Sequence, residues 1–239
     1  MGRLLDFRKF FPSNVAAFVS DRTIDFKHKD DCLSLSLKQK KYLSCASGIK
    51  ISLLPNIKQI HGRRIIVVKK PSCFGPRQPM KADGMMTKKT GIPLTVRTAD
   101  CLSIFMFDPK KNAIALVHAG WRGSHSHIAG RAVVLMKKHF GTHPKDLKIA
   151  FGPSICGCCY EVGAEFKKFF PKETVLKGGK YFFDLALANK RQLVKAGVNP
   201  KNIFDPNICT FCNKQYFSHR REGAQAGRMI SFMMLKDSK

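Results

Sequence analysis

Residues 101–123 have the sequence CLSIFMFDPKKNAIALVHAGWRG, which carries the clearest structural pattern of the chain. It holds two apolar runs of strand length, 102–107 and 113–117. Residues 108–112 between them include Asp, Pro and Asn, which are turn formers. The stretch therefore predicts a β-hairpin.

The predicted hairpin brings a thiol and an imidazole together. A turn centred between Pro109 and Lys110 would place Cys101 directly opposite His118. Directly opposed residues have Cβ atoms about 4.5–5.5 Å apart, which suits two ligands of one metal ion. It equally suits the thiolate and imidazolium of a cysteine hydrolase. The alternative is a purely structural role, in which Cys101 is a buried thiol and His118 is a hydrogen-bonded histidine.

The segment that follows His118 leads from a strand into a helix start. Its two glycines, Gly120 and Gly123, leave backbone amides available, and the helix dipole favours an anion there. The Arg122 guanidinium adds a bidentate donor. We expect Arg122, Gly123 and Ser124 to bind phosphate; an ordinary tight turn is the alternative.

The rest of the chain alternates between strand and helix patterns. Helical spacing predicts a helix over 128–140, which Ser124 or Ser126 caps and Gly141 ends. Further helices are predicted over 162–170 and 185–196, and strands over 65–68, 94–97, 147–151 and 229–235. Residues 1–50, with an alternating stretch at 33–37, are expected to form antiparallel strands. A Pro-rich loop is expected over 71–79. We predict one domain, 1–239, of mixed α/β class, with largely antiparallel sheets and flanking helices.

Composition limits the partners and the compartment. The net charge is +27, and the lysines are spread from Lys9 to Lys239 without a stripe. This distribution predicts non-specific polyanion binding rather than specific nucleic-acid recognition. No apolar run reaches the roughly 18 residues of a membrane span, and the start of the sequence, Met1 to Asp6, lacks the apolar region and the small-residue cleavage site of a signal peptide. We therefore expect no membrane association, a cytoplasmic location and reduced cysteines.

Five of the nine cysteines lie in two groups, which allow two interpretations, a zinc site or reduced thiols. Cys156, Cys158 and Cys159 could join Cys209 and Cys212, which have C-x-x-C spacing, in a four-cysteine zinc site. Reduced, partly buried thiols are the favoured interpretation.

Six motifs in a fixed order carry a family resemblance. They are Gln59-Ile60-His61-Gly62, Ala82-Asp83-Gly84, Thr98-Ala99-Asp100-Cys101, residues 118–123 (HAGWRG), Gly152-Pro153 with residues 158–163 (CCYEVG), and Ser218-His219-Arg220-Arg221. On these motifs the chain resembles the YfiH family, which is also described as laccase-domain, polyphenol oxidase-type or purine nucleoside phosphorylase proteins.

The resemblance implies a YfiH-like fold and an active site made of His61, Cys101 and His118. These three residues would be catalytic and would bind one metal ion, zinc or alternatively copper. Three protein ligands leave a fourth position open, as in catalytic zinc sites. The implied reaction is phosphorolysis of adenosine, inosine and methylthioadenosine, with adenosine deamination as a related activity. The partners would be a purine nucleoside and phosphate, and the protein a monomer or homodimer.

The N-terminal part departs from the family pattern. The usual T-R-x-G-G and S-L-N-L stretches are replaced by Asp21–Asp25 and by residues 34–37, SLSL. Residues 1–50 are thus divergent, which predicts altered substrate preference or reduced activity. Arg22 is a candidate anion-facing arginine, and Asp83 or Asp100 is a candidate acid for purine departure.

Two other functions fit parts of the sequence. A copper-dependent polyphenol oxidase of laccase type would need repeated His-x-His pairs, and only His125-Ser126-His127 occurs among eight histidines. A diverged basic binding protein without enzymatic activity, or an envelope-associated protein, is the other alternative, because the family has also been linked to peptidoglycan editing.

Overall fold

The predicted hairpin lies at the centre of the molecule. The computed structural model describes residues 4–27, 35–51, 54, 57–70 and 79–237. Strands β8 (Leu102–Asp108) and β9 (Ala113–Ala119) pair antiparallel, and every residue in both is buried. They form the middle of a six-stranded sheet with order β14-β10-β8-β9-β6-β4. The other members are β4 (Ile65–Val67), β6 (Gly84–Thr87), β10 (Lys148–Phe151) and β14 (Ile203–Phe204).

The hairpin register differs from the predicted one by two residues. Ser103, not Cys101, lies opposite His118. The four-residue loop is set by Asp108, whose Oδ1 accepts hydrogen bonds from the amides of Lys110 (2.9 Å) and Lys111 (3.0 Å). Side chains alternate between the two faces of a sheet, so a shift of two residues leaves Cys101 on the His118 face. The predicted pairing was wrong, but Cys101 and His118 do lie close together, as predicted.

A second sheet packs face to face with the first. It has the order β1-β2-β15-β7 and is antiparallel throughout. Its strands are β1 (Leu5–Asp6), β2 (Val15–Val19), β7 (Leu94–Thr98) and β15 (Met229–Leu235). Between the sheets, Phe105 and Leu116 from the hairpin share one core cluster with Val96 and Met233. Every residue of β15 is buried, as its apolar run predicts.

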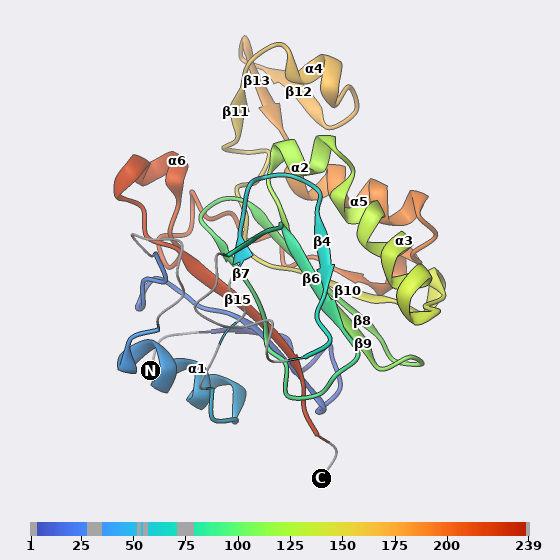
Figure 1. Ribbon diagram of the computed structural model, residues 1–239. Helices are drawn as coiled ribbons and strands as arrows, with labels where there is room; N and C mark the ends of the chain where they lie inside the picture. The colour runs from blue at the N-terminus through green and yellow to red at the C-terminus, as the bar shows by residue number, and fades with distance from the viewer. Residues whose placement is uncertain (1–3, 28–34, 52–53, 55–56, 71–78, 238–239) are drawn as a thin grey trace.

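Helices cover the outer faces of the two sheets (Figure 1). Helices α3 (Ile128–Phe140) and α5 (Leu185–Lys195) pack on the six-stranded sheet, where Ile128 and Leu193 share a cluster with Ile104 and Val117. Helix α1 (Leu37–Ser47) packs on the second sheet through Leu43. The molecule is thus layered helix, sheet, sheet, helix, and the predicted mixed α/β class with largely antiparallel sheets and flanking helices is confirmed.

Smaller elements complete the fold. A three-stranded sheet, β11-β13-β12, projects at the top of Figure 1. Its strands are β11 (Glu161–Val162), β12 (Thr174–Lys177) and β13 (Lys180–Phe183), beside α4 (Phe166–Phe169). The remaining pieces are the parallel pair β3 (Ile57–Lys58) and β5 (Met80–Lys81), the short helices α2 (Trp121–His125) and α6 (His219–Glu222), and 3-10 turns at 144–146, 200–202 and 223–225.

The structure corrects three local predictions. Residues 37–47 are helical, although strands were expected before residue 50. The helix predicted over 162–170 is limited to Phe166–Phe169, because Val162 pairs with Tyr181 in the small sheet. Neither Ser124 nor Ser126 caps α3; the chain first forms α2, and His127, with φ 59°, precedes α3. Residues 71–78 of the predicted Pro-rich loop and residues 33–34 of the alternating stretch lie outside the described residues.

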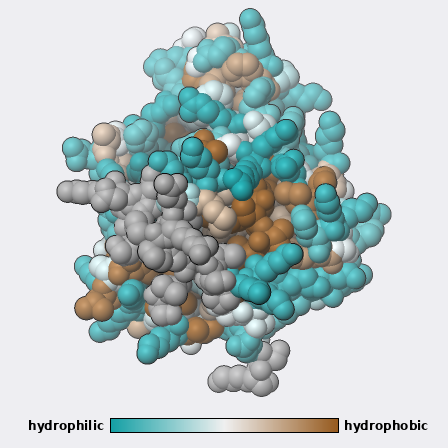
Figure 2. Space-filling view, viewed as in Figure 1, coloured by the Kyte–Doolittle hydropathy of each residue, from teal (hydrophilic) through white to brown (hydrophobic). Residues whose placement is uncertain are grey.

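Most of the surface in Figure 2 is hydrophilic, as the charge predicts. A hydrophobic area lies near β4, the edge strand of the six-stranded sheet, whose residues are half-buried. Within the described residues, none of the helices has the length and apolar character that a membrane crossing needs.

Candidate metal centre

Three segments of the chain bring His61, Cys101 and His118 together. His61 lies in the loop between β3 and β4, Cys101 directly precedes β8, and His118 belongs to β9. Their potential ligand atoms all lie within 4.8 Å of one another. The two imidazole rings are 4.9 Å apart and nearly perpendicular, at 82°. His118 is buried, Cys101 is half-buried and His61 is exposed, so the group opens to solvent on one side.

The loops that carry His61 and Cys101 adopt unusual backbone conformations. His61 has φ 57°, and Asp100, the residue before Cys101, has φ 86°. Residues other than glycine enter this left-handed region at a cost in free energy and persist there only when surrounding contacts fix them. Both loops have such contacts, and in both a carboxylate supplies them.

Asp83 fixes the His61 loop and His118 at the same time. Its fully buried carboxylate accepts hydrogen bonds from the amides of His61 (2.8 Å) and Gly62 (2.8 Å). Its Oδ1 also lies 2.9 Å from His118 Nδ1. An imidazole that donates from Nδ1 to a carboxylate leaves Nε2 as its free ligand atom. Asp83 therefore orients two of the three candidate ligands.

The same contacts exclude Asp83 as a proton donor. Burial alone would raise the pKa of Asp83, but the hydrogen bond and charge of His118 and the amides of Gly62 and His61 lower it below the usual value. A carboxyl with a lowered pKa stays ionised at neutral pH. The candidate acid role of Asp83 is thus replaced by a positioning role.

Asp100 is also committed to the local structure. Its Oδ1 accepts a hydrogen bond from Thr210 Oγ1 (2.6 Å), and its Oδ2 accepts one from the amide of Arg220 (2.6 Å). Asp100 therefore ties the loop before Cys101 to the segment after β14 and to the start of α6. Both carboxylate oxygens are engaged, so Asp100 is a poor candidate for the acid.

Cys101 and His118 form a charged pair. Burial opposes ionisation of the thiol, but His118 and then His61 lower the pKa of Cys101 to about 6. Burial also opposes protonation of the imidazole, yet Cys101 and Asp83 raise the pKa of His118 to about 9. The thiolate is the form of cysteine that binds metals and attacks electrophiles. Both shifts favour the thiolate and the imidazolium at neutral pH, and a metal ion that binds Cys101 and His118 would displace the proton from Nε2.

Two glycines allow the close approach of these groups. A Cβ atom added at Gly120 would lie 3.0 Å from Cys101 Sγ and 3.0 Å from His61 Cδ2. One added at Gly123 would lie 2.9 Å from the Gly62 carbonyl oxygen. A side chain at either position would therefore collide with groups of the site, which explains the two glycines of the HAGWRG segment.

The donor set fits a zinc ion. Zinc binds imidazole nitrogen at about 2.0–2.1 Å and thiolate sulfur at about 2.3 Å in tetrahedral geometry, which separates ligand atoms by about 3.5 Å. Donor atoms within 4.8 Å of one another can reach that arrangement through small side-chain rotations. Two imidazoles and one thiolate also suit copper.

A pocket of about 440 Å³ opens beside the three residues. Its lining includes three cationic side chains, those of Lys27, Arg97 and Arg228, together with Gln59 and His219. Asp25 brings two of these segments together, because its Oδ1 accepts hydrogen bonds from the amides of Lys27 (2.7 Å) and Arg228 (2.8 Å). The pocket therefore combines candidate metal ligands with a positive wall.

Sequence patterns did not assign Lys27, Arg97, Arg228 or His219 to the site. His219 lies within a quoted family motif, Ser218–Arg221, and that motif was the available signal. Lys27 belongs to the divergent N-terminal part, where no motif marks it. Arg97 and Arg228 lie on or just before neighbouring strands, β7 and β15, and only strand pairing places both at the pocket.

The predicted phosphate-binding residues lie elsewhere. Arg122 is exposed, and its guanidinium carbon is 4.6 Å from the centre of the Trp121 ring. Gly123 and Ser124 are buried, and Ser124 Oγ accepts a hydrogen bond from Asn189 (2.8 Å). None of the three is among the residues that line the pocket.

Arg22, the candidate anion-facing arginine, pairs with Glu222 at 3.2 Å and does not line the pocket. A second hollow of about 540 Å³ is lined by Trp121, Tyr160 and Arg220, among others. It lies on the α2 side of the site.

Known proteins resemble the chain in sequence and in fold. A family model described as "multi-copper polyphenol oxidoreductase laccase" matches residues 23–236. A purine nucleoside phosphorylase of Clostridium acetobutylicum is 35% identical over 164 residues, which cover 67% of this chain and 70% of that protein. A protein of an unknown prokaryotic organism, named adenosine deaminase RL5, is 34% identical over 217 residues, 84% of this chain and 82% of that protein. The crystal structure of the hypothetical protein YfiH of Bacillus licheniformis superposes with a TM-score of 0.84 at 25% identity, covering 99% of this chain and 97% of that one.

Proposed function

Because the chain belongs to the laccase-like family whose model matches residues 23–236, the family that its motifs resemble, we propose that it is a purine nucleoside phosphorylase. Relatives at about a third identity carry that name. The observation that supports the proposal most is the pocket, in which a His/Cys/His group faces three cationic side chains. Such a pocket suits a reaction in which phosphate is a substrate.

We assign the metal to His61, Cys101 and His118, and we propose zinc. When bound, the ion supplies a Lewis acid that polarises a substrate oxygen. Asp83 keeps His118 Nδ1 protonated and its Nε2 available, and it holds the His61 loop in its left-handed conformation. Gly120 leaves the space in which these side chains meet.

We place the phosphate against Lys27, Arg97 and Arg228, because they line the pocket. This placement replaces the site first expected at Arg122, Gly123 and Ser124. In phosphorolysis a phosphate oxygen forms a bond to the anomeric carbon of the ribose while the bond from that carbon to the purine nitrogen breaks. The cationic wall would orient the phosphate and offset its charge.

The departing purine nitrogen receives the bonding electron pair and needs a proton. His219 is the proposed donor, because it lines the pocket and histidine is the side chain that most often serves as a general acid. Asp83 and Asp100 are both engaged in other hydrogen bonds. The products are the free base and the sugar 1-phosphate, which is ribose 1-phosphate when the substrate is adenosine or inosine.

Two other activities have different support. Adenosine deamination is proposed as a related activity, because a relative that covers 84% of the chain is named adenosine deaminase. A multicopper oxidase needs several clustered histidine ligands. Within the described part of the chain, only one candidate metal group contains histidine, and it has two. We do not propose oxidase activity. The cytoplasmic location and the monomeric or homodimeric state stay predictions.

Product analysis tests the proposal. Purified protein is incubated with adenosine, inosine or methylthioadenosine, with and without phosphate, and the products are separated by chromatography. We expect free base and sugar 1-phosphate only when phosphate is present. Release of base at the same rate without phosphate would indicate a hydrolase, and inosine formation alone would indicate a deaminase; either result would refute the phosphorylase assignment.

A further inference from the structure

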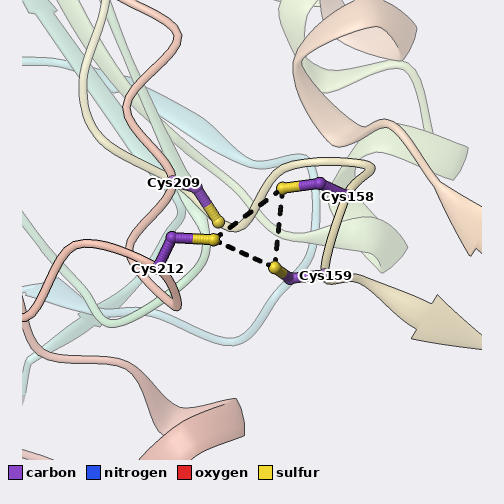
Figure 3. Close-up of side chains that lie close together, drawn as sticks. All are labelled: Cys158, Cys159, Cys209 and Cys212. Atoms are coloured by element: carbon purple, nitrogen blue, oxygen red, sulfur yellow. Dashed lines mark hydrogen bonds between the residues drawn. The ribbon is translucent and has the colours of Figure 1, made fainter.

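Four cysteines that have no place in the proposed reaction lie together outside the pocket. Cys158 and Cys159 lie between β10 and β11, and Cys209 and Cys212 follow β14. Their sulfur atoms point toward a common centre (Figure 3) and lie within 4.8 Å of one another. The group comes from two chain segments about fifty residues apart in sequence.

Backbone hydrogen bonds hold both segments in place. The amide of Cys159 donates to the Cys156 carbonyl (2.9 Å), which turns the first segment. The amide of Asn213 donates to the Cys209 carbonyl (2.9 Å), which closes the C-x-x-C turn. A parallel bridge between Ser154 and Cys209 joins the two segments. The sulfurs therefore converge on a framework that main-chain contacts define.

The sulfur spacing matches a tetrahedral metal site. Cys158 Sγ lies 3.5 Å from Cys159 Sγ and 4.0 Å from Cys212 Sγ, and Cys159 Sγ lies 3.2 Å from Cys212 Sγ. Four sulfurs at about 2.3 Å from one zinc ion are about 3.8 Å apart. A disulfide would need about 2.05 Å.

Exposure argues against a purely hydrophobic role for these thiols. A free cysteine that serves only for packing is usually buried. Here Cys158 and Cys212 are exposed and Cys159 is half-buried; only Cys209 is buried. The four cysteine side chains thus converge near the surface and not in the core, which is the arrangement expected of metal ligands.

We propose that Cys158, Cys159, Cys209 and Cys212 bind one zinc ion as a closed tetrathiolate site. The ion would displace four thiol protons to solvent and leave a site with a net charge of about −2. Four protein ligands leave no open position, so this ion would be structural, unlike the one assigned to His61, Cys101 and His118.

The surroundings can compensate a dianionic site. The amide of Cys156 donates to Cys209 Sγ (3.5 Å). The guanidinium of Arg221 donates to the carbonyls of Thr210 (2.5 Å) and Phe211 (2.8 Å), the two residues between Cys209 and Cys212. A cation is thus fixed on the C-x-x-C turn itself.

The site would support the catalytic pocket from a distance. Thr210 lies within the C-x-x-C turn, and its hydroxyl donates to Asp100, the neighbour of Cys101. A zinc ion that holds this turn would therefore hold the loop before Cys101. Its loss should lower thermal stability first and activity as a consequence.

Metal content distinguishes the two sites. Zinc is measured by atomic spectroscopy in the purified full-length protein, in Cys212→Ser, in Cys101→Ala and in Cys45→Ser, an exposed cysteine on α1 that serves as control. We expect about two zinc ions per chain in the wild type and in Cys45→Ser, and about one in Cys212→Ser and in Cys101→Ala. A Cys212→Ser protein that keeps the wild-type zinc content would overturn the tetrathiolate site. An unchanged content in Cys101→Ala would affect only the other assignment.

Cysteine alkylation of the unmutated protein avoids any folding defect of the variants. Protein purified under reducing conditions is treated with iodoacetamide before and after removal of zinc by a chelator, and each cysteine is mapped by mass spectrometry. We expect the four cysteines to be protected only before chelation and Cys45 to react in both samples. Equal reaction in both samples, or a disulfide among the four cysteines, would overturn the proposal.

Discussion

At the scale of single residues, one carboxylate organises the candidate metal centre. Asp83 is fully buried and accepts hydrogen bonds from three backbone amides, those of residues 60–62, and from His118. It contacts the ligands without belonging to the candidate donor set. Groups in this position fix the tautomer and the ring orientation of ligating histidines.

Asp83→Asn should weaken metal binding and turnover together. The amide side chain retains the shape but loses the charge that orients His118, so we expect metal affinity and kcat to fall by about 10- to 100-fold. Zinc competition with a chromogenic chelator and steady-state assays measure the two effects. Asp146→Asn, at a surface ion pair with Lys110, is the matched control. Wild-type zinc affinity in Asp83→Asn would contradict the positioning role.

Arg228→Ala should raise the KM for phosphate by about tenfold or more, since a hydrogen bond to a charged group contributes about 1.5–3 kcal/mol. The KM for nucleoside should change much less, because the proposed contact is with phosphate. Lys195→Ala, which removes an exposed cation at the end of α5, should leave both constants unchanged. Equal increases in both KM values would place Arg228 outside the phosphate site.

Residues of the candidate site differ in how far the sequence predicts them. The hairpin pattern alone places Cys101 near His118, because side-chain alternation tolerates the two-residue error in register. His61 comes from the family resemblance, since no local pattern links its loop to the hairpin. Lys27 lies near Arg228 because the Arg228 amide donates to Asp25 across 203 residues, a contact that no local period encodes.

At the scale of secondary structure, the sequence predicted the elements that have strong local signals. It failed where two local patterns conflicted or where pairing was non-local. The 3.6-residue spacing and Gly141 define α3, as predicted, and Asp184 caps α5 through the Leu187 amide. Helix α1 was missed although Ser36 and Gln39 form a capping box, because the alternating leucines before it suggested a strand. Val162 was assigned to a helix because its pairing with Tyr181 is non-local.

The packing of α2 on α5 gives a prediction at this scale. Asn189 Nδ2 donates to Ser124 Oγ (2.8 Å) and to the Leu185 carbonyl, and Asn189 is fully buried. Asn189→Ala leaves buried polar partners unsatisfied, so the free energy of unfolding should fall by about 1–3 kcal/mol. Urea unfolding followed by circular dichroism measures the change.

A control on the same helix separates this effect from helix propensity. Val194 is an exposed residue of α5, and Val194→Ala should change the free energy of unfolding by no more than about 0.5 kcal/mol. Similar losses in both variants would show that the buried hydrogen bond to Ser124 makes no specific contribution.

At the scale of the whole molecule, the mixed α/β class followed from the balance of strand and helix patterns. Central strands with continuous apolar runs are buried on both faces, by the second sheet on one side and by α3 and α5 on the other. The sequence predicted the class but not the layer order, because the packing of β15 between β2 and β7 joins distant segments.

The net charge of +27 predicts weak and salt-sensitive binding to polyanions. Affinity for duplex DNA, measured by fluorescence anisotropy, should fall at least about tenfold between roughly 50 and 200 mM salt and should not depend on base sequence. Nucleoside turnover should be unaffected by the DNA at the higher salt concentration. Tight binding to one sequence at that salt concentration would instead support a nucleic-acid-binding function.

The most direct test of the candidate centre is phosphate-dependent release of base by the wild type and by Cys101→Ala, with zinc measured on the same samples. We predict turnover in the wild type. In Cys101→Ala we predict that turnover is lost and that the protein contains one zinc ion fewer than the wild type, because Cys101 is a proposed ligand of the catalytic ion. Cys45→Ala should behave as the wild type. Undiminished phosphorolysis by a folded Cys101→Ala protein would contradict the assignment of the reaction to His61, Cys101 and His118.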